Sequence, residues 1–442
     1  MTEGEPTVTD YLERAEISSF HHWILTIACI IYALAAMNVM LIGAALPAIS
    51  KEWGLDPTVA GLLLSSGYVG MFIGALSFGI VADRIGRKAA LLATVILSAV
   101  FTGLCSTAWD VASMSTLRFL AGIGLGGILP QPGVYVSEFI PADRRGKYLG
   151  LVETSWVYGA LLAILFPYAL IPGFGWRRTF LVAFTPLILI PFIIWRMPES
   201  FRYLELKGLR DRIIAELRRY GLIAVSETSL KVVVETRRSI LESLKELWSP
   251  IYRWRTLVLW MGWAALVYTY HGIFQWLPSV YYNMGFTHTK SLYFVLLITL
   301  LQVPGYYSAT FMLDTVGRKR ILAAYLGVAG IACLLFSMAG SFQEILLWSG
   351  VISFFNLGAW AALYTYTPEL YPTRIRGAGS GSAASIGRLA GIGAPILTGY
   401  LWANWGLTSA FTAFTLAHVI PALIVGALGV ETKRKILEEI SK

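Results

Sequence analysis

The stretch "EFIPADRRGKYLG" (residues 138–150) has a counterpart in "ELYPTRIRGAGSG" (residues 369–381). Both contain the skeleton E-x-x-P-x-x-x-R-G, and each skeleton residue lies 231 positions after its counterpart. A charged loop is therefore present twice, each time between apolar segments. The repetition indicates a duplicated unit whose two copies place the same charges at equivalent points.

A second pair of motifs has the same offset. "GIVADRIGRK" (residues 79–88) matches "FMLDTVGRKR" (residues 311–320), so that Asp83 corresponds to Asp314. Two motifs at one offset predict that the chain consists of two six-helix halves. Parallel repeats that enclose a site near the middle of the membrane are typical of secondary transporters.

The composition indicates a membrane protein. The chain has 442 residues, of which 56% are hydrophobic and 14% charged, whereas a soluble protein has about 25% charged residues. A membrane-spanning helix needs about 20 apolar residues. Long runs without Asp, Glu, Lys or Arg cover residues 23–50, 57–82, 89–109, 256–289, 291–313, 321–343 and 345–368. Together with apolar segments that contain a few charges, they predict twelve transmembrane helices rather than a soluble core.

Lysine and arginine are concentrated in alternate loops, which predicts the orientation. Basic clusters follow the second, fourth, sixth, eighth and tenth predicted helices, and such loops stay in the cytoplasm. We therefore expect an all-α membrane protein with two pseudo-symmetric six-helix bundles and both termini in the cytoplasm. The expected parts are an N-terminal segment (1–22), a first bundle (23–196), a linker with short helices (197–255), a second bundle (256–430) and a tail (431–442).

Several other classes of function are not expected. The net charge of +9 reflects the basic cytoplasmic loops, so we expect no binding to nucleic acid. Cys29, Cys105 and Cys333 fall inside predicted helices without metal-ligand spacing, so neither a disulfide nor a metal site is expected. Residues 1–22 are polar and lead directly into a full-length span, which argues against a cleavable signal peptide. We expect no cofactor and no enzymatic activity.

These motifs resemble those of the major facilitator superfamily along the whole chain. G-x-x-x-D-R-x-G-R-K (79–88) is its loop signature, and "PESFRYL" (198–204) and "VETK" (430–433) are similar to signatures of sugar porters and organic-ion transporters. In the last motif Val430 replaces the usual proline. "GLVETSW" (150–156) and "GRLAGIGAP" (387–395) are most similar to the niacin-permease and synaptic-vesicle-glycoprotein branch.

The charged loops predict a cytoplasmic gate. One exposed ion pair contributes only ~0–1 kcal/mol, so a gate needs a network of pairs. We expect the network to hold the cytoplasmic side closed when the cavity opens outward, although the charges also serve as a positive-inside anchor. The resemblance adds Glu199 and Glu431 to the acids of the repeated motifs. The predicted gate residues are Asp83, Arg87, Glu138, Arg145, Glu199, Asp314, Arg318, Glu369, Arg376 and Glu431.

Ionisable side chains inside predicted membrane helices are costly and usually functional. Three stand out: Arg118, Glu153 and Arg388. The resemblance implies that Asn38 occupies a position where proton-coupled relatives carry Asp and facilitators carry Asn. An amide cannot take up and release a proton as a carboxyl group can, which leaves Glu153 as the proton-coupling candidate. Proton-linked and facilitated transport both remain open.

The uncharged residues of the membrane helices favour a flat organic anion over a sugar. The chain has only four Asn and four Gln, whereas 13% of its residues are aromatic. Arginine pairs with a carboxylate while aromatic rings stack on the body of a ligand. The resemblance places Arg388 where organic-anion transporters keep an arginine. The candidate substrate-binding residues are Asn38, Tyr68, Arg118, Tyr135, Glu153, Trp156, His271, Gln275, Trp276, Asn356, Trp360, Tyr364 and Arg388.

The sequence thus predicts a secondary transporter, acting as a monomer in the cytoplasmic membrane. We expect it to move a small organic anion, such as an aromatic or other monocarboxylate, by rocker-switch alternating access, with or without proton symport. A sugar porter, an organic-cation transporter or a phosphate transporter is the alternative. A membrane receptor or structural protein that transports nothing is the alternative from another class.

Overall fold

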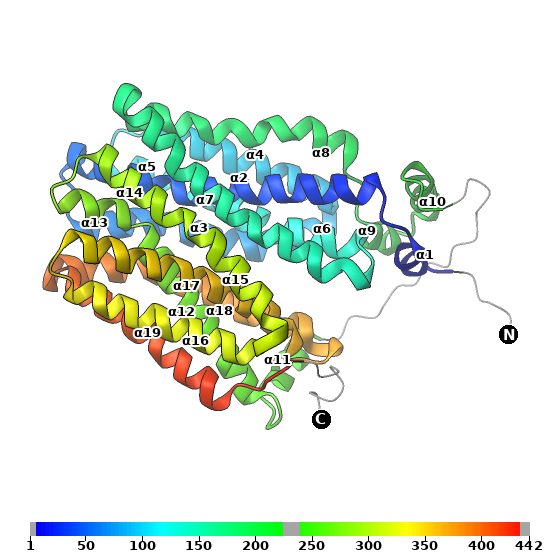
Figure 1. The fold of residues 1–442 in the computed structure, drawn as a ribbon. Helices are drawn as coiled ribbons and strands as arrows, with labels where there is room; N and C mark the ends of the chain where they lie inside the picture. Colours follow the sequence, from blue (N-terminus) through cyan, green and yellow to red (C-terminus); the bar gives the residue numbers. More distant parts are fainter. Residues whose placement is uncertain (1–5, 224–238, 434–442) are drawn as a thin grey trace.

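The computed structural model describes residues 6–223 and 239–433, and their regular structure is helical (Figure 1). The first part of the chain forms α1 (Val8–Arg14), α2 (Ser19–Trp53), α3 (Pro57–Ile85), α4 (Arg87–Leu104), α5 (Val111–Ile128), α6 (Gln131–Phe139), α7 (Ala142–Thr179) and α8 (Ile190–Arg196). Two 3₁₀ segments, η1 (Cys105–Thr107) and η2 (Phe180–Leu189), interrupt them.

Three short helices follow: α9 (Phe201–Leu206), α10 (Arg210–Arg219) and α11 (Ile240–Leu247). The second part of the chain forms α12 (Arg253–Phe274), α13 (Leu277–Asn283), α14 (His288–Leu300), α15 (Gln302–Val316), α16 (Arg318–Met338), α17 (Phe342–Glu369), α18 (Thr373–Trp405) and α19 (Leu407–Leu428). The three short helices fall within residues 197–255, the predicted linker, of which residues 224–238 lie outside the described part.

Ten helical runs within the described residues are long and apolar enough to cross a membrane. One of them, Ala142–Arg196, has 55 residues, far more than the roughly 20 that one crossing needs. Gly175 interrupts this run with a left-handed backbone (φ 74°). Helix α18 has 33 residues, but it contains Arg374, Arg376 and Arg388, and it is not among these ten runs.

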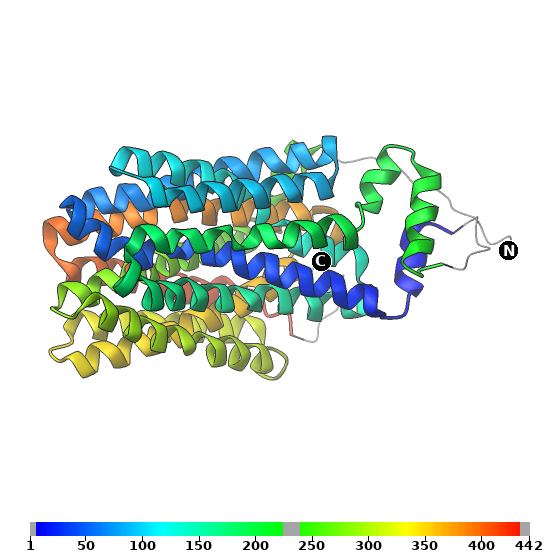
Figure 2. The ribbon, with the colours of Figure 1, turned by 90° about the horizontal axis from the view of Figure 1, so that it is seen from above.

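The helices of each part of the chain pack mainly with one another (Figures 1 and 2). In the first part, α3 packs on α5 and α2 packs on α7; in the second, α16 packs on α19 and α12 packs on α18. Between the two parts, the main contacts join α3 to α18 and α7 to α14. The duplication read from the two motifs is thus accompanied by two groups of helices that meet along a limited interface.

The two ends of the molecule differ. The charged motifs, together with α1, α9, α10 and α11, lie at one end, which we call the charged end (residues 83–88, 138–147, 314–320 and 369–376; Figures 1 and 2). At the opposite end, α3 begins and α18 finishes, and there the two parts touch closely. The Ser65 hydroxyl donates to the Ile392 carbonyl (2.8 Å), and a Cβ added at Gly61 would lie 2.5 Å from the Pro395 carbonyl oxygen. We call this the closed end.

The repeated Gly-Arg-Lys motifs form equivalent turns at the charged end. Gly86 ends α3 with φ 100°, and Gly317 ends α15 with φ 116°, a backbone region that strongly favours glycine. A Cβ at Gly86 would lie 2.4 Å from the Glu199 carboxylate, and one at Gly317 would lie 2.4 Å from the Glu431 carboxylate. Each glycine is therefore required both by the turn and by the acid that packs against it.

Candidate functional site

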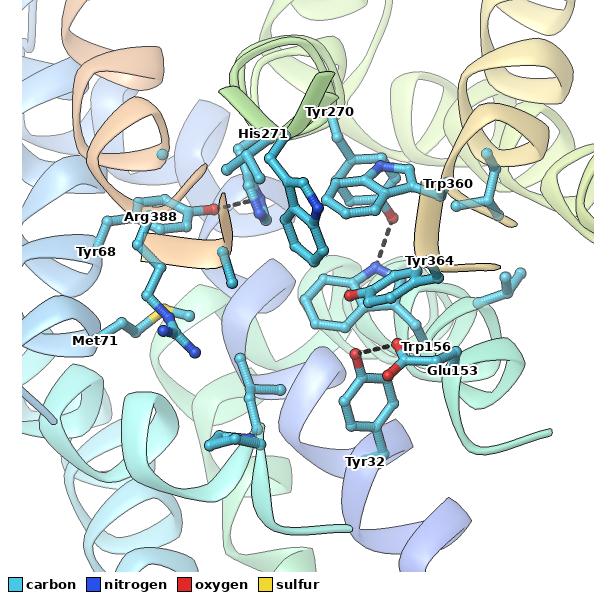
Figure 3. A pocket seen from close by; sticks show the side chains of 18 of the residues that line it. Tyr32, Tyr68, Met71, Glu153, Trp156, Tyr270, His271, Trp360, Tyr364 and Arg388 are labelled. Carbon is cyan, nitrogen blue, oxygen red and sulfur yellow. Dashed lines mark hydrogen bonds between the residues drawn. The ribbon is translucent and has the colours of Figure 1, made fainter. Parts of the chain in front are cut away.

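A cavity of about 270 Å³ lies where the two parts of the chain meet. Ligand sites usually enclose about 300–1,000 Å³, so this cavity suits a small molecule. Its lining is rich in tyrosine and tryptophan and comes from both groups of helices (Figure 3). The lining residues are Tyr32, Tyr68, Met71, Leu129, Pro130, Glu153, Trp156, Val157, Trp263, Val267, Tyr270, His271, Tyr306, Leu357, Trp360, Tyr364, Ala384, Arg388 and Gly391.

Arg388 supplies the positive charge of the cavity. It lies on α18, and Figure 3 shows its side chain extending from that helix into the space between the two groups of helices. No described residue forms a hydrogen bond or an ion pair with its guanidinium group. A guanidinium offers five N–H donors in a fork that fits a carboxylate, so this side chain is available for an anion.

Glu153 supplies the negative charge. It lies on α7, and the Tyr32 hydroxyl of α2 donates to its Oε2 at 2.7 Å. Tyr364 lies beside this pair (Figure 3). The acid of the cavity therefore has a partner from its own group of helices, whereas Arg388 across the cavity has none among the described residues.

Aromatic side chains form much of the remaining walls, and hydrogen bonds and edge-to-face contacts hold them in place. Trp156 Nε1 donates to the Tyr270 hydroxyl at 2.9 Å (Figure 3). Trp263 meets Trp360 with ring centroids 5.6 Å apart at 86°, a favourable edge-to-face geometry. Such fixed rings can stack on a flat ligand without a large loss of conformational entropy.

A hydrogen-bonded chain crosses between the two parts beside the cavity. The Gln275 amide nitrogen, at the end of α12, donates to the Val39 carbonyl (3.1 Å) and to the Tyr68 hydroxyl (3.0 Å). The Tyr68 hydroxyl in turn lies 2.7 Å from Nδ1 of His271. This chain joins α2 and α3 to α12, and it lies between the cavity and the closed end.

Of the thirteen predicted substrate-binding residues, seven line the cavity: Tyr68, Glu153, Trp156, His271, Trp360, Tyr364 and Arg388. Sequence reasoning missed Tyr32, Trp263, Tyr270 and Tyr306, which also line it. A signal was present for two of them, because Trp263, Val267 and Tyr270 follow the i, i+4, i+7 spacing of one helix face.

Asn38 and Arg118 lie outside the cavity lining. Asn38 is fully buried, and its amide nitrogen donates to the Ala183 carbonyl at 3.4 Å. Arg118 donates to the backbone carbonyls of Asn38 (3.1 Å) and Val39 (3.5 Å). Arg118 therefore holds α5 against α2 through main-chain oxygens.

The other four candidates also lie behind the walls. Asn356 donates to Thr269 Oγ1 at 3.0 Å and packs against His418, within the second group of helices. Trp276 packs on Trp402 at the closed end, with ring centroids 5.5 Å apart.

Tyr135 is buried against Phe139 near the charged end. Gln275 reaches the cavity only through Tyr68.

The predicted gate residues form two equivalent clusters at the charged end. In the first, Glu199 accepts from the backbone amides of Arg87 (2.8 Å) and Lys88 (3.1 Å), which begin α4. In the second, Glu431 accepts from the backbone amide of Arg318 (2.9 Å), which begins α16. A carboxylate at the start of a helix satisfies free amides and is stabilised by the helix dipole.

The second acid of each cluster repeats the pattern. Ser200 Oγ donates to Glu138 at 2.6 Å, and Thr432 Oγ1 donates to Glu369 at 2.6 Å. Arg318 adds side-chain ion pairs with Asp314 (2.8 Å) and Glu369 (3.2 Å).

The arginines at equivalent positions of the two repeated loops, Arg145 and Arg376, make other contacts. Arg145 pairs with Glu13 of α1 at 2.9 Å, a partner the sequence did not indicate. Arg376 Nε donates to the Tyr371 carbonyl at 3.4 Å. Each of these bonds lies within one part of the chain and its neighbouring terminal segment.

The model of the "Sugar (and other) transporter" family matches residues 24–442. The niacin transporter NiaP of Acinetobacter baylyi is 37% identical, with 97% of this chain and 98% of that protein covered. The benzoate transport protein of the same organism is 26% identical (90% and 87% covered), and the synaptic vesicle 2-related protein of Rattus norvegicus is 25% identical (100% and 84% covered).

A solved structure supports the fold. The inward-open xylose transporter XylE from E. coli superposes with a TM-score of 0.75 at 18% identity, covering 95% of this chain and 99% of that one. The resemblance to the major facilitator superfamily and its niacin-permease branch is thereby confirmed. The chain belongs to the sugar (and other) transporter family, and it is a multi-pass protein of the cytoplasmic membrane that moves a small organic solute.

Proposed function

We propose that the protein carries an aromatic monocarboxylate whose carboxylate group binds Arg388. One observation carries this proposal: a guanidinium group projects into an aromatic cavity and forms no ion pair with a described residue. A charge held away from water is strongly destabilising unless a partner compensates it, and a carboxylate is the partner that fits guanidinium geometry. The aromatic walls then contact the ring of the ligand.

The relatives add support from their names. Niacin and benzoate, which two relatives are named for, each consist of one aromatic ring with one carboxylate. Both molecules are small and flat, which agrees with a cavity of about 270 Å³. The cavity lining contains no Asn or Gln among the described residues, so it offers few amide groups for the hydroxyl groups of a sugar.

The topology that goes with this proposal has twelve spans and both termini in the cytoplasm. The 55-residue run Ala142–Arg196 supplies two spans, one on each side of Gly175, and α18 supplies another. The charged end is then cytoplasmic, as expected from its lysines and arginines. The two bundles correspond to residues 23–196 and 256–430, and the monomer contains a complete cavity.

Transport proceeds by alternating access in this proposal. In this proposal the close contacts of Gly61 and Ser65 with α18 block the route to the outside, and the described state faces inward. Opening outward requires these contacts and the Gln275–Tyr68 hydrogen bond to separate. The two clusters at the charged end would then approach each other, and their arginines and acids would form the cytoplasmic gate.

Glu153 is the proposed site of proton coupling. It is the only carboxyl group among the described cavity-lining residues, and it lies across the cavity from the arginine that binds the anion. A proton taken up by Glu153 would balance the charge of the carboxylate as the loaded protein changes state. The proposed coupling is therefore symport of a proton with the anion.

A thermal-shift screen of the purified, detergent-solubilised protein tests the proposal, because a ligand that binds only the folded state raises its melting temperature. We expect nicotinate and benzoate to raise it, and we expect nicotinamide, hexoses, organic cations and phosphate to leave it unchanged. Arg388→Gln should abolish the shift. Arg144→Gln, which changes an exposed arginine whose one ion pair among the described residues is with its neighbour Asp143, is the matched control and should preserve it. A shift by a sugar alone would contradict the proposal.

A further inference from the structure

The chain of hydrogen bonds beside the cavity determines where His271 carries its proton. The Val39 carbonyl can only accept, so the Gln275 side-chain atom facing it is the amide nitrogen. The second hydrogen of that nitrogen goes to the Tyr68 hydroxyl oxygen at 3.0 Å, a nearer and stronger acceptor than the Met40 sulfur at 3.6 Å. The Tyr68 hydroxyl thus accepts one bond, and its own hydrogen remains free to be donated.

That hydrogen goes to His271. The distance from the Tyr68 oxygen to Nδ1 of His271 is 2.7 Å, and Figure 3 shows this bond at the cavity wall. Nδ1 is therefore the acceptor, and a neutral imidazole with an unprotonated Nδ1 carries its hydrogen on Nε2. The side chain is 8% exposed and lines the cavity, and no described residue bonds to Nε2. The cavity consequently contains one fixed, neutral N–H donor besides Arg388.

We propose that the Nε2–H group of His271 donates a hydrogen bond to an acceptor atom in the ring of the bound carboxylate. The cavity then selects pyridine carboxylates over benzoates, which have the same carboxylate and ring size but present C–H where the pyridine presents nitrogen. This inference rests on the proposed function, because Arg388 holds the carboxylate in both classes of ligand.

Tyr68 acts as a positioning residue in this arrangement. Its hydroxyl occupies Nδ1 and thereby keeps the hydrogen of the imidazole on the nitrogen that faces the ligand. Without that hydroxyl, the imidazole can adopt either neutral form, and the form with hydrogen on Nδ1 presents an acceptor to the ring nitrogen. The relay from Val39 to His271 crosses between the two parts of the chain, so it is assembled when the closed end is closed.

Isothermal titration calorimetry tests the proposal with four probes: benzoate and pyridine-2-, pyridine-3- and pyridine-4-carboxylate. We expect at least one pyridine carboxylate to bind the unaltered protein about 10-fold more tightly than benzoate, as one added hydrogen bond allows. His271→Phe should bring this ratio of Kd values to about 1. His271→Gln, which keeps an N–H donor, should retain most of the ratio.

The positioning role has its own variants. Tyr68→Phe should lower the ratio partway, whereas Tyr281→Phe removes a buried hydroxyl that bonds to Ser349 outside the cavity lining and should leave the ratio unchanged. If His271→Phe does not fold, the ratio of the unaltered protein and the effect of Tyr68→Phe decide the matter.

Two results would overturn the inference: benzoate binding as tightly as all three pyridine carboxylates, or a ratio that survives both His271→Phe and Tyr68→Phe. Failure of every carboxylate to bind would instead contradict the proposed function.

Discussion

The two halves of the molecule contribute opposite charges to one cavity, and among the described residues only the negative charge has a hydrogen-bond partner. The first half contributes Glu153, which accepts a hydrogen bond from Tyr32 of the same half. The second half contributes Arg388, to which no described residue bonds. A paired acid is suited to hold or release a proton, whereas an unpaired base is suited to bind an anion. The duplicated fold has therefore diverged at its centre while its charged end remains nearly symmetric.

Arg388→Gln should break this division of roles most severely. The variant keeps hydrogen-bonding capacity but loses the charge, so we expect uptake of nicotinate or benzoate into proteoliposomes to fall about 100-fold or more, as for a buried ion pair that loses one partner. Arg388→Lys keeps the charge but not the fork of donors, so its uptake rate should lie between those of the unaltered protein and Arg388→Gln. Uptake by Arg388→Gln at the original rate would contradict the role of Arg388.

Glu153→Gln should separate coupling from binding. The amide cannot exchange a proton, so accumulation driven by an inward proton gradient should decrease about 10-fold or more, while exchange of labelled for unlabelled carboxylate continues. Tyr32→Phe is the matched variant, because it removes the partner of the acid and keeps the carboxyl group itself. Gradient-driven accumulation by Glu153→Gln at the original level would place the coupling elsewhere.

Gly86→Ala and Gly317→Ala test the symmetry of the charged end. Each adds a methyl group at a positive φ and against a glutamate, so each should reduce the folding free energy by about 1–3 kcal/mol, and the two effects should be similar. Gly79→Ala is the control, since a Cβ there meets nothing within 4 Å. Melting temperatures of the three purified variants measure the difference.

Glu13→Gln should have the smallest effect. It removes the carboxylate that pairs with Arg145 in this state, and an exposed pair contributes only ~0–1 kcal/mol. Freed from α1, Arg145 can pair across the gate, so the population should shift modestly towards the outward-facing state. Spin-label distances between the two halves at the charged end would detect the shift, and a shift in the opposite direction would show that α1 plays no part in holding the gate open.

The sequence predicted the helical membrane fold because its evidence is local: uncharged runs, basic loops and two motifs at one spacing. It also predicted the acids of the charged end, since family signatures mark them. The cavity was harder, because a polar residue within a helix can face either the cavity or a neighbouring helix. Arg118 bonds to main-chain carbonyls of α2, and no sequence pattern reveals such a partner. Tyr32 and Tyr306 were missed for the same reason, since isolated aromatic residues are common on every face of a membrane helix.

The most direct test of the account is the affinity of benzoate relative to benzamide, measured by calorimetry for the unaltered protein and for Arg388→Gln. The two ligands share size and ring and differ in charge, so the comparison isolates the contact between carboxylate and guanidinium. The account predicts that the unaltered protein prefers benzoate by about 100-fold and that Arg388→Gln reduces this preference to about 1. A preference that is the same in both proteins would contradict it.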